Sequence, residues 1–488
     1  GLVFQNFRGS GVVIENGSDG NTITGNHIGI GADGSTEAGN LDDGIRIESA
    51  GNHVVGNLIA GNQEVGIRLT GPAATGNAIQ GNLIGVDASG TTAIGSLYGI
   101  LVDAGSHANL IGGAAPGAGN LFGGNGQAAI AIIDSSDVKI QGNRIGVTAG
   151  GTPMLNGGGL DGILLLRSTN VLIGTDADGI DDTLEGNLIA GASVFQIEID
   201  HSDNVAIAGN QIGLASTPMT AGIALTHASH DNRIGGTAPV ESNLFIGADT
   251  FGVWLDPNAG SGNSLLGNRF LGNAGIAIDL GPLGATPNDP LDADAGPNDL
   301  QNTPRIDHAV ADGVNSRVRG ELASEPNRTY RIEFFMSSSG GAERAETLLG
   351  TLDVTTDGDG IATFDFVTGP IAAGAWISAT ATQADAGFTV FGSTSELSAA
   401  TRALLPTPPT GGDASVYSDE DTPVVLTADQ FHFQDVNGDA FIGVRIDSLP
   451  VSGTLRLDGI DVIAGQTISI TDILAGKLQY VPAADANF

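Results

Sequence analysis

The sequence predicts an all-β chain that opens with a right-handed parallel β-helix of about ten coils, followed by β-sandwich modules. Two short motifs recur out of phase with each other through residues 1–283. The 488-residue chain also contains 76 glycines and 41% hydrophobic residues, and it lacks any stretch of helical periodicity. Short strands joined by many tight turns account for this composition, and a repeat of fixed size identifies a solenoid.

The first motif is Gly-Asn followed by apolar residues. Its asparagines are Asn26, Asn57, Asn82, Asn120, Asn143, Asn187, Asn210 and Asn268, and Asn243 follows a serine instead. Between strands the backbone must enter the left-handed region, which asparagine tolerates. Stacked asparagine side chains can also form a hydrogen-bonded ladder. We therefore expect these residues at one corner of successive coils.

The second motif is a glycine followed by alternating apolar residues. It occurs ten times, from "GVVIE" (11–15) to "GIAID" (275–279), with shortest separations of 22 and 23 residues. One unit has room for three short strands, and its apolar face becomes buried when units stack. Parallel strands stack about 4.8 Å apart, so ten coils predict a rod of roughly 45 Å.

A longer phrase, "GNLIGVDASGTTAIG" (81–95), recurs in variant form at 25–39, 142–157 and 209–222. It is either an insertion tolerated at a corner or a loop that walls a binding face. Together with "LIGGAAPGAGN" (110–120), it resembles bacterial surface and secreted proteins with parallel β-helix repeats of the pectate lyase-like kind. The resemblance covers 1–283 and implies the fold, whereas most such proteins have no assigned activity.

The outward side of the second motif carries a catalytic candidate. Side chains alternate along a strand, so the first and third residues after the glycine face the core and the second and fourth face outward. The candidate comprises Arg46, Arg68, Glu15 and Glu48. Uronate elimination needs carboxylates that hold calcium on the substrate acid and a base that removes the C5 proton. The alternative is a surface ion-pair ladder, worth less than about 1 kcal/mol per pair.

A second outward group is a carbohydrate-binding candidate, because tryptophan beside carboxylates is typical of a sugar platform. It comprises Glu198, Asp200, His201, His227, Trp254 and Asp256. Nearby "LDPN" (255–258) resembles the Asp-Pro-His of alginate epimerases, with Asn258 in place of the histidine. Between the two groups the outward positions are apolar, which predicts a covering loop or partner.

The charge of the chain restricts its partners. Lys and Arg number 18 against 55 Asp and Glu, giving a formal net charge of −37. Such a field repels nucleic acid and anionic membranes. No apolar run is long enough to predict direct membrane insertion. The absence of cysteine excludes a disulfide framework and suits a cytosolic protein or a large secreted bacterial protein equally.

Residues 284–304 form an acidic junction rich in Asp, Asn and Pro. Its candidate metal ligands are Asp289, Asp292, Asp294 and Asp299. Alternating oxygen ligands with a glycine turn favour Ca²⁺, although no glutamate closes the loop as in an EF-hand. The alternative is a solvated acidic linker. "DADGIDDTLEGN" (176–187) is a weaker case of the same kind.

Residues 305–404 keep the two-residue alternation without the asparagine corners. "TYRIEFF" (329–335) and "GAWISATATQ" (374–383) indicate strands, and "DGDG" (357–360) indicates a hairpin turn. About 100 residues of antiparallel strands predict an immunoglobulin-like β-sandwich. The Pro-rich segment 405–413 is expected to be a stiff linker.

The segment 414–488 carries Asp419-Glu420-Asp421, "DVNGDAF" (435–441), "SGTLRLDG" (452–459) and "AGKLQYVP" (475–482). These phrases resemble the cadherin-like tandem repeats of giant bacterial adhesins. The resemblance implies Ca²⁺ binding between neighbouring domains through Asp419, Asp421, Asp435, Asn437 and Asp439. It also implies a truncated cadherin-like β-sandwich domain, because the family's last strand is not reached, and further tandem domains as partners.

Three β modules in series with acidic joints describe a rigid extracellular rod. We therefore expect a non-enzymatic, adhesin-like fragment, secreted or on the bacterial cell surface and rigidified by Ca²⁺. Its β-helix face would bind a polysaccharide or a cell-surface ligand. A calcium-dependent polysaccharide lyase or C5-epimerase is one alternative, and a structural sheath or fibre subunit is the second.

Overall fold

The computed structural model describes the 488-residue chain except residues 16, 155–158, 216–218, 339–343, 420 and 485–488. It contains two compact units. The first comprises residues 1–307, 317–369 and 374–402, and the second comprises 308–316, 370–373 and 403–488. Among the described residues, no helix is long and apolar enough to cross a membrane.

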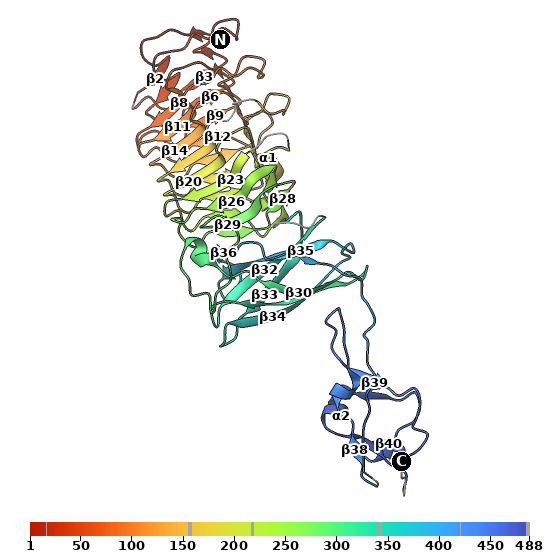
Figure 1. The fold of residues 1–488 in the computed structure, drawn as a ribbon. Helices are drawn as coiled ribbons and strands as arrows, with labels where there is room; N and C mark the ends of the chain where they lie inside the picture. Colours follow the sequence, from red (N-terminus) through yellow and green to blue (C-terminus); the bar gives the residue numbers. More distant parts are fainter. Residues whose placement is uncertain (16, 155–158, 216–218, 339–343, 420, 485–488) are drawn as a thin grey trace. The chain divides into compact units, whose positions relative to one another are not determined.

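The first unit begins with three long parallel sheets that wind around one core, one strand of each per coil (Figure 1). Sheet A contains β1 (Val3–Phe4), β4 (His27–Ile28), β7 (Leu58–Ile59), β10 (Leu83–Ile84), β13 (Leu121–Phe122), β16 (Arg144–Ile145), β19 (Leu188–Ile189), β22 (Gln211–Ile212), β25 (Leu244–Ile246) and β28 (Arg269–Leu271). Sheet B contains β2 (Val12–Ile14), β5 (Ile45–Ile47), β8 (Val65–Thr70), β11 (Tyr98–Asp103), β14 (Ala128–Ile133), β17 (Asp161–Leu166), β20 (Phe195–Asp200), β23 (Met219–Thr226), β26 (Ala248–Leu255) and β29 (Ile276–Leu280).

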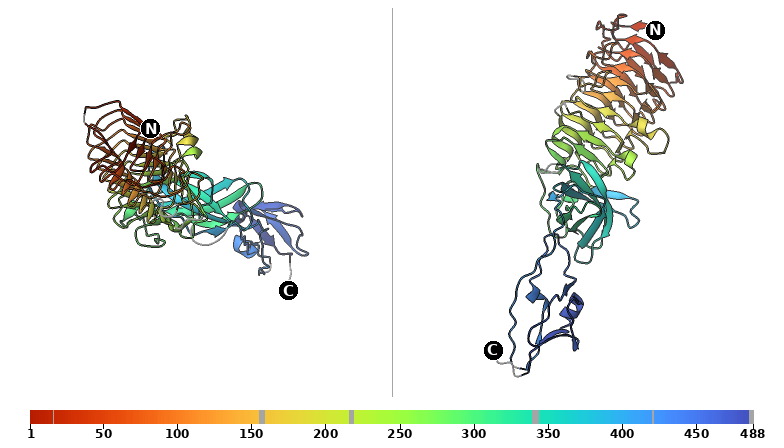
Figure 2. Two further views of the ribbon diagram at one scale, coloured as in Figure 1. Left: turned by 90° about the horizontal axis from the view of Figure 1, so that it is seen from above. Right: turned by 90° about the vertical axis from the view of Figure 1, so that its right-hand side faces the viewer.

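Sheet C completes each coil. It contains β3 (Thr22–Thr24), β6 (His53–Val55), β9 (Ala78–Gln80), β12 (Leu110–Gly112), β15 (Lys139–Gln141), β18 (Leu172–Gly174), β21 (Ala206–Ala208), β24 (Arg233–Gly235) and β27 (Ser264–Leu266). The stacked coils are visible from the side in Figure 2. A parallel β-helix is therefore confirmed, its last strand β29 ends at Leu280, and the two ten-stranded sheets match the ten predicted coils.

The core is a set of aliphatic ladders. In sheet B, Ile67, Ile100, Ile130, Ile163, Ile197 and Ile223 are partners in register on successive coils, and all are fully buried. Burying one such side chain is worth about 1.5–3 kcal/mol, and a single coil could not achieve it alone. The predicted alternation holds, because Arg68 and Thr70 stay partly exposed between the buried residues.

The predicted asparagine ladder is also confirmed. Each Nδ2 donates to the Oδ1 of the next asparagine along the stack, at 2.9–3.1 Å, from Asn26 through to Asn268. Most of these backbone N–H groups donate to the same oxygen, as Asn143 does to Asn187 at 2.9 Å. The hydrogen bonds offset the cost of removing these buried amides from water, and they form only when the coils are in this register.

The left-handed residue at this corner differs from the prediction. None of the ladder asparagines has a positive φ; at six of the nine positions the preceding glycine takes it, as at Gly56 (φ 64°) and Gly142 (φ 65°), whereas Gly119, Gly186 and Ser242 do not. Glycine adopts this conformation without steric cost, so the asparagine that follows it does not need to do so.

The described parts of three recurrent loops, 25–39, 81–95 and 142–154, stack on one another outside sheet A. Ala88 N–H donates to Gly34 O, and Ala149 N–H donates to Gly90 O, both at 2.9 Å. Beneath them Val86, Val147 and Met154 form a small apolar cluster of their own. These three loops therefore line part of one side of the coil stack. Further insertions form α1 (Asp182–Glu185) and the 3₁₀ helix η1 (Pro239–Glu241).

After the 3₁₀ segment η2 (Pro297–Leu300) the chain forms two smaller sheets. One contains β30 (Arg305–Val310), β31 (Ser316–Ala323) and β34 (Ile361–Thr368). The other is antiparallel and contains β32 (Thr329–Ser337), β33 (Thr347–Thr355), β35 (Trp376–Ala384), β36 (Phe391–Thr394) and β37 (Thr401–Arg402). The "DGDG" segment does turn, but β33 and β34 belong to different sheets, so the predicted hairpin is wrong. The immunoglobulin-like assignment stays a prediction.

The β32–β35 sheet covers the last coil of the β-helix through buried carboxylates. Both Glu333 oxygens accept from Gly267 N–H, at 3.1 and 2.9 Å. Glu396 accepts from Leu280 N–H at 2.9 Å and from Thr286 N–H at 2.8 Å. The N–H groups of Gly267 and Leu280 lie on the last coil and have no further coil to pair with, and an unpaired buried donor costs about 1–3 kcal/mol. The carboxylates thus terminate the solenoid.

The second unit contains a four-stranded sheet, a two-stranded sheet, α2 (Ile470–Leu474) and the 3₁₀ helix η3 (Ala428–Phe431). Its strands are β38 (Val424–Val425), β39 (Gly443–Arg445), β40 (Thr454–Leu457), β41 (Ile460–Asp461), β42 (Thr467–Ser469) and β43 (Leu478–Val481). A small core of Leu455, Val462, Ile468, Ile473 and Leu478 holds them together. The cadherin-like assignment stays a prediction.

The carboxylate clamp predicts a pH dependence of stability. Burial raises the pKa of Glu333 to about 7 from the ordinary glutamate value of 4.5. The folded protein therefore binds more protons than the unfolded chain between these two pH values, so stability falls as the pH rises through this window. Glu333→Gln, which mimics the protonated form, should raise the melting temperature at pH 8 and leave it nearly unchanged at pH 5.

The measurement is thermal unfolding across pH 4 to 9 for both proteins, with the exposed Glu64→Gln as a control that keeps the wild-type slope. Equal pH slopes for wild type and Glu333→Gln would contradict the role assigned to this carboxylate.

Candidate functional site on the outer face of sheet B

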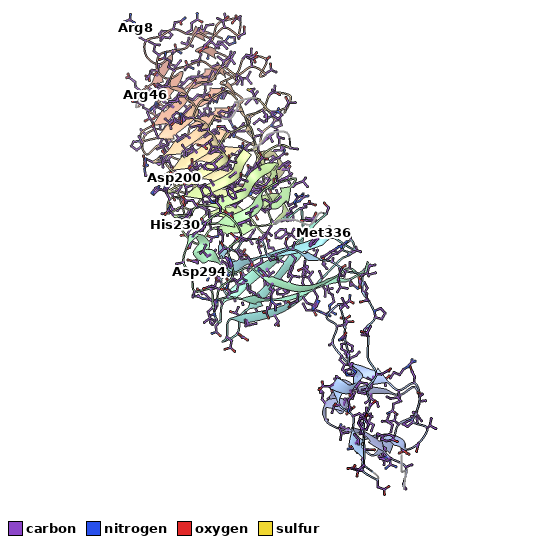
Figure 3. All side chains as sticks on the ribbon, in the orientation of Figure 1. Arg8, Arg46, Asp200, His230, Asp294 and Met336 are labelled. Atoms are coloured by element: carbon purple, nitrogen blue, oxygen red, sulfur yellow. The ribbon has the colours of Figure 1, made fainter. Side chains whose placement is uncertain are left out.

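The candidate site lies where β17, β20, β23 and β26 present their outward residues. The register places Leu164 beside Glu198, Glu198 beside Ala224, and Ala224 beside Trp254 on successive coils. Another row runs from Leu166 through Asp200 to Thr226. Residues that lie 26 to 34 apart in the sequence thus come together on one surface. Figure 3 shows Arg46 and Asp200 along the same side of the coil stack.

The aromatic part of the site is larger than the sequence suggested. The ring centroid of Trp254 lies 6.2 Å from that of Phe195 and 5.8 Å from that of Phe251. Phe195 and Phe251 occupy the position just before the motif, preceding Gln196 and Gly252, on coils on either side of Ala221. Trp254 and Phe195 are half-buried, whereas Phe251 is buried, so the three rings form an apolar platform whose accessible part belongs to Trp254 and Phe195.

Carboxylates border this platform. Burial, together with the charges of Asp200 and Asp256, raises the pKa of Glu198. Burial and the charge of Glu198 raise the pKa of Asp161 to about 7. One Asp161 oxygen is buried without a hydrogen-bond partner. Buried carboxylates with raised pKa values destabilise the folded state, and they are found most often at functional sites.

Asp161 was missed by the sequence analysis. It precedes the motif glycine, a position that holds Val65, Tyr98, Ala128 and Phe195 on other coils. An aspartate among the apolar residues of the neighbouring coils was the available signal, although Asp43 holds the same position on an earlier coil. Asp256 does not face outward as predicted. It is buried, and its Oδ1 accepts from Asn258 N–H at 2.8 Å. It shapes the turn after β26 rather than facing outward.

Two histidines share one carboxylate at the edge of the site. His201 and His227 follow β20 and β23 directly, and their Nδ1 atoms lie 2.5 and 3.3 Å from Asp200 Oδ1. Their rings are parallel, with centroids 5.3 Å apart and an interplanar angle of 4°. The structure therefore brings together five of the six predicted carbohydrate-binding residues and adds Asp161, Phe195 and Phe251.

The register of the last coil departs from the predicted alignment. Motif spacing puts Ala277 beside Trp254, but the structure pairs Trp254 with Asp279. Asp279 is fully buried, and burial raises its pKa to about 6. Because Asp279 Oδ1 accepts from Gly284 N–H at 2.9 Å, it anchors the chain as it leaves the β-helix.

The predicted catalytic group is a network of ion pairs. Arg46 Nε lies 2.7 Å from Glu48 Oε1, while Arg68 lies 3.0 Å from Asp43 Oδ2 and 3.3 Å from Asp103 Oδ2. Glu15 is exposed on the preceding coil. Both arginines are thus held by carboxylates, which matches the ion-pair alternative. Asp43 is fully buried, and burial raises its pKa to about 6 despite Arg68.

The acidic junction brings three of its four predicted ligands together. Single oxygens of Asp289, Asp292 and Asp294 lie within 4.8 Å of one another. One Asp294 oxygen is buried without a hydrogen-bond partner. Asp299 is held elsewhere, because its oxygens accept from Ser261 and Ser393 at 2.6 and 3.1 Å.

The remaining acidic segments behave differently. Asp176, Asp182 and Glu185 also lie within 4.8 Å, but Lys139 Nζ contacts Asp176 at 2.9 Å and supplies a positive charge. In the second unit, Asp435 Oδ1 accepts from Asn437 and Asp439 N–H groups, at 2.8 and 2.9 Å. Among the described residues, no three of the carboxylates of Asp419, Asp421, Asp435 and Asp439 converge as a possible metal group.

Comparisons with known proteins add little to this geometry. No protein-family model matches the chain, and no curated protein matches it. Among solved structures, tailspike protein 2 of an Escherichia coli O157:H7 bacteriophage aligns over 80% of this chain and 59% of its own, with 9% identity and a TM-score of 0.33. Its enzymatically active domain aligns over 80% of this chain and 66% of its own, with 10% identity and a TM-score of 0.31.

The A-module of mannuronan C-5 epimerase from Azotobacter vinelandii aligns over 57% of this chain and 78% of its own, with 13% identity and a TM-score of 0.34. The chain thus spans less than two thirds of the length of the tailspike proteins. At these identities and scores the site must be interpreted from its own residues.

The Arg68 network yields a direct prediction. Arg68→Met leaves the buried Asp43 carboxylate without its cation, which costs about 3 kcal/mol for a buried charge. Asp43→Asn removes that charge, so the double variant Arg68→Met/Asp43→Asn should recover most of the loss. Chemical denaturation of wild type, both single variants and the double variant measures the coupling. Additive single effects would show that the two residues do not act as a pair.

Proposed function

We propose that this chain is a non-enzymatic, carbohydrate-binding protein of the bacterial surface or extracellular space, which binds a polysaccharide on the outer face of sheet B around Trp254. The observation that carries the proposal is the cluster of Trp254, Phe195 and Phe251, bordered by the carboxylates of Glu198 and Asp200. Sugar rings present an apolar face that stacks on aromatic rings and hydroxyl groups that donate to carboxylates.

The rigid frame supports this assignment. Coils stack about 4.8 Å apart, so a linear polymer lying along the stack meets repeated, evenly spaced contacts. The aromatic rings pack on one another and the strands are locked by the asparagine ladder. A pre-ordered surface loses little conformational entropy on binding.

The charge of the site restricts the ligand. Asp161, Glu198 and Asp200 lie on this face of a chain with a net charge of −37. An acidic polysaccharide would be repelled unless a cation intervened. A neutral or amino-sugar polymer is therefore the class of ligand that we propose.

We also propose that Ca²⁺ binds at the acidic junction, through Asp289, Asp292 and Asp294. The fit rests on oxygen-only ligands and on the buried, unpartnered oxygen of Asp294, which a hard cation would satisfy. Asp292 is firmly positioned, because it accepts from Asn302 N–H at 3.0 Å and from Gln301 Nε2 at 2.7 Å. An ion here would stiffen the segment that follows the last coil.

Asp161 supports a second candidate, an enzyme that cleaves the bound polymer. A carboxyl group with a pKa near 7 beside a second carboxylate has the protonation state that a general acid needs. The same assay addresses both candidates, because binding and newly formed chain ends are measured together.

The central prediction concerns Trp254. Trp254→Ala should weaken binding to the best polymer of a neutral, amino-sugar and acidic polysaccharide panel by more than about tenfold, since it removes the stacking surface. Tyr98→Ala is the matched control, as an aromatic residue on the same sheet several coils away, and it should bind like the wild type. Affinity electrophoresis gives the binding, and assays for reducing and unsaturated ends give any cleavage.

Unchanged binding by Trp254→Ala would contradict the proposed face. New chain ends that disappear in Asp161→Asn, with binding retained, would replace the binding function by the enzymatic one.

The calcium prediction is tested by thermal unfolding. Ca²⁺ at 100 times its Kd should stabilise the protein by about 2.7 kcal/mol and raise its melting temperature. Asp294→Asn should abolish that rise. Asp299→Asn should be less stable but keep the full response to Ca²⁺, because Asp299 bonds to serines outside the cluster. A rise that persists in Asp294→Asn would exclude this location.

A further inference from the structure

The geometry points to a transition-metal site formed by Asp200, His201 and His227 at the corner that follows β20 and β23. The ligand class is a borderline divalent ion such as Zn²⁺, because imidazole with carboxylate suits such ions better than Ca²⁺. The inference stands apart from the proposed glycan binding, although Asp200 borders both.

The coil repeat itself builds the site. Asp200 is the register partner of Thr226, so His201 and His227 occupy equivalent places on adjacent coils. His201 N–H donates to Thr226 O at 3.4 Å, which ties the two corners together. Both histidines have left-handed backbones, with φ of 47° and 46°. Their parallel rings lie 5.3 Å apart, close to the coil spacing of about 4.8 Å.

The ligand atoms converge on one point. Both Nδ1 atoms face the same Asp200 oxygen, at 2.5 and 3.3 Å, and all three ligand atoms lie within 4.8 Å of one another. With zinc bonds of about 2.0–2.1 Å, ligand atoms of a tetrahedral site lie roughly 3.3 Å apart. The His227 contact already has that length. The His201 contact must lengthen by a fraction of an ångström as the metal replaces the proton between the two atoms.

The surroundings favour a cation over a purely structural contact. His201 and His227 are about half exposed, so an ion can reach them, and Glu198 adds a carboxylate to the same face. Three protein ligands leave a fourth position open, the arrangement of zinc sites that bind a further ligand. Three residues after His227 in the same corner, His230 contacts Asp231 at 2.9 Å and belongs to no possible metal group among the described residues, which provides an internal comparison.

The experiment is Zn²⁺ titration calorimetry on the whole chain, with any histidine tag removed and Ca²⁺ present to occupy carboxylate-only sites. We expect one Zn²⁺ per chain in a binding event that weakens more than about tenfold in His201→Asn and in His227→Asn. Asparagine is chosen because it tolerates the left-handed backbone. His230→Asn should bind like the wild type. No binding, or equal binding by all three variants, would overturn the site.

A second measurement covers the case in which the histidine variants unfold. Electron paramagnetic resonance of one equivalent of Cu²⁺ on the wild-type chain should show hyperfine coupling to two imidazole nitrogens. A spectrum with one nitrogen or none would overturn the site. Because neither measurement includes a polysaccharide, failure here leaves the glycan assay intact, and the reverse is also true.

Discussion

The constant register between coils is the constraint on which every other feature depends. Backbone hydrogen bonds and the buried asparagine ladder hold it jointly, and the ladder joins residues 23 to 44 positions apart. A slip of one residue would turn an outward row of side chains into the core. The aromatic platform, the histidine pair and the arginine network all exist because neighbouring coils cannot slide.

Much of the fold follows from the sequence because the periodic signal is local. Each copy of the second motif predicts one strand from its own residues, so ten copies predict ten strands. The register of β29 was misjudged, because motif spacing cannot show how many residues β26 and the following loops consume. The strands around "DGDG" were misjudged for a related reason: a turn signal does not say which sheet each strand joins.

Residues of the candidate site could be predicted from the sequence only where they occupy positions within the repeated motif. Glu198, Asp200 and Trp254 occupy counted motif positions, whereas Asp161 lies just outside them. Asp256 was predicted to bind carbohydrate and Asp299 to bind a metal, but their oxygens accept from backbone or serine groups of turns, and no motif position announces such partners. With 18 basic residues against 55 acidic ones, many carboxylates in this chain must bond to N–H and hydroxyl groups, and composition alone cannot tell which.

The carboxylate clamp on the last coil has a consequence for assembly. A parallel β-helix has no intrinsic length, since each finished coil offers the next one a complete edge of donors and acceptors. Glu333 and Glu396 accept from N–H groups of that edge through their side chains, which offer no strand backbone on which another coil could pair. The module that carries them acts as a stop signal. Without it, the rod would end in an open template onto which strands of other molecules could polymerise.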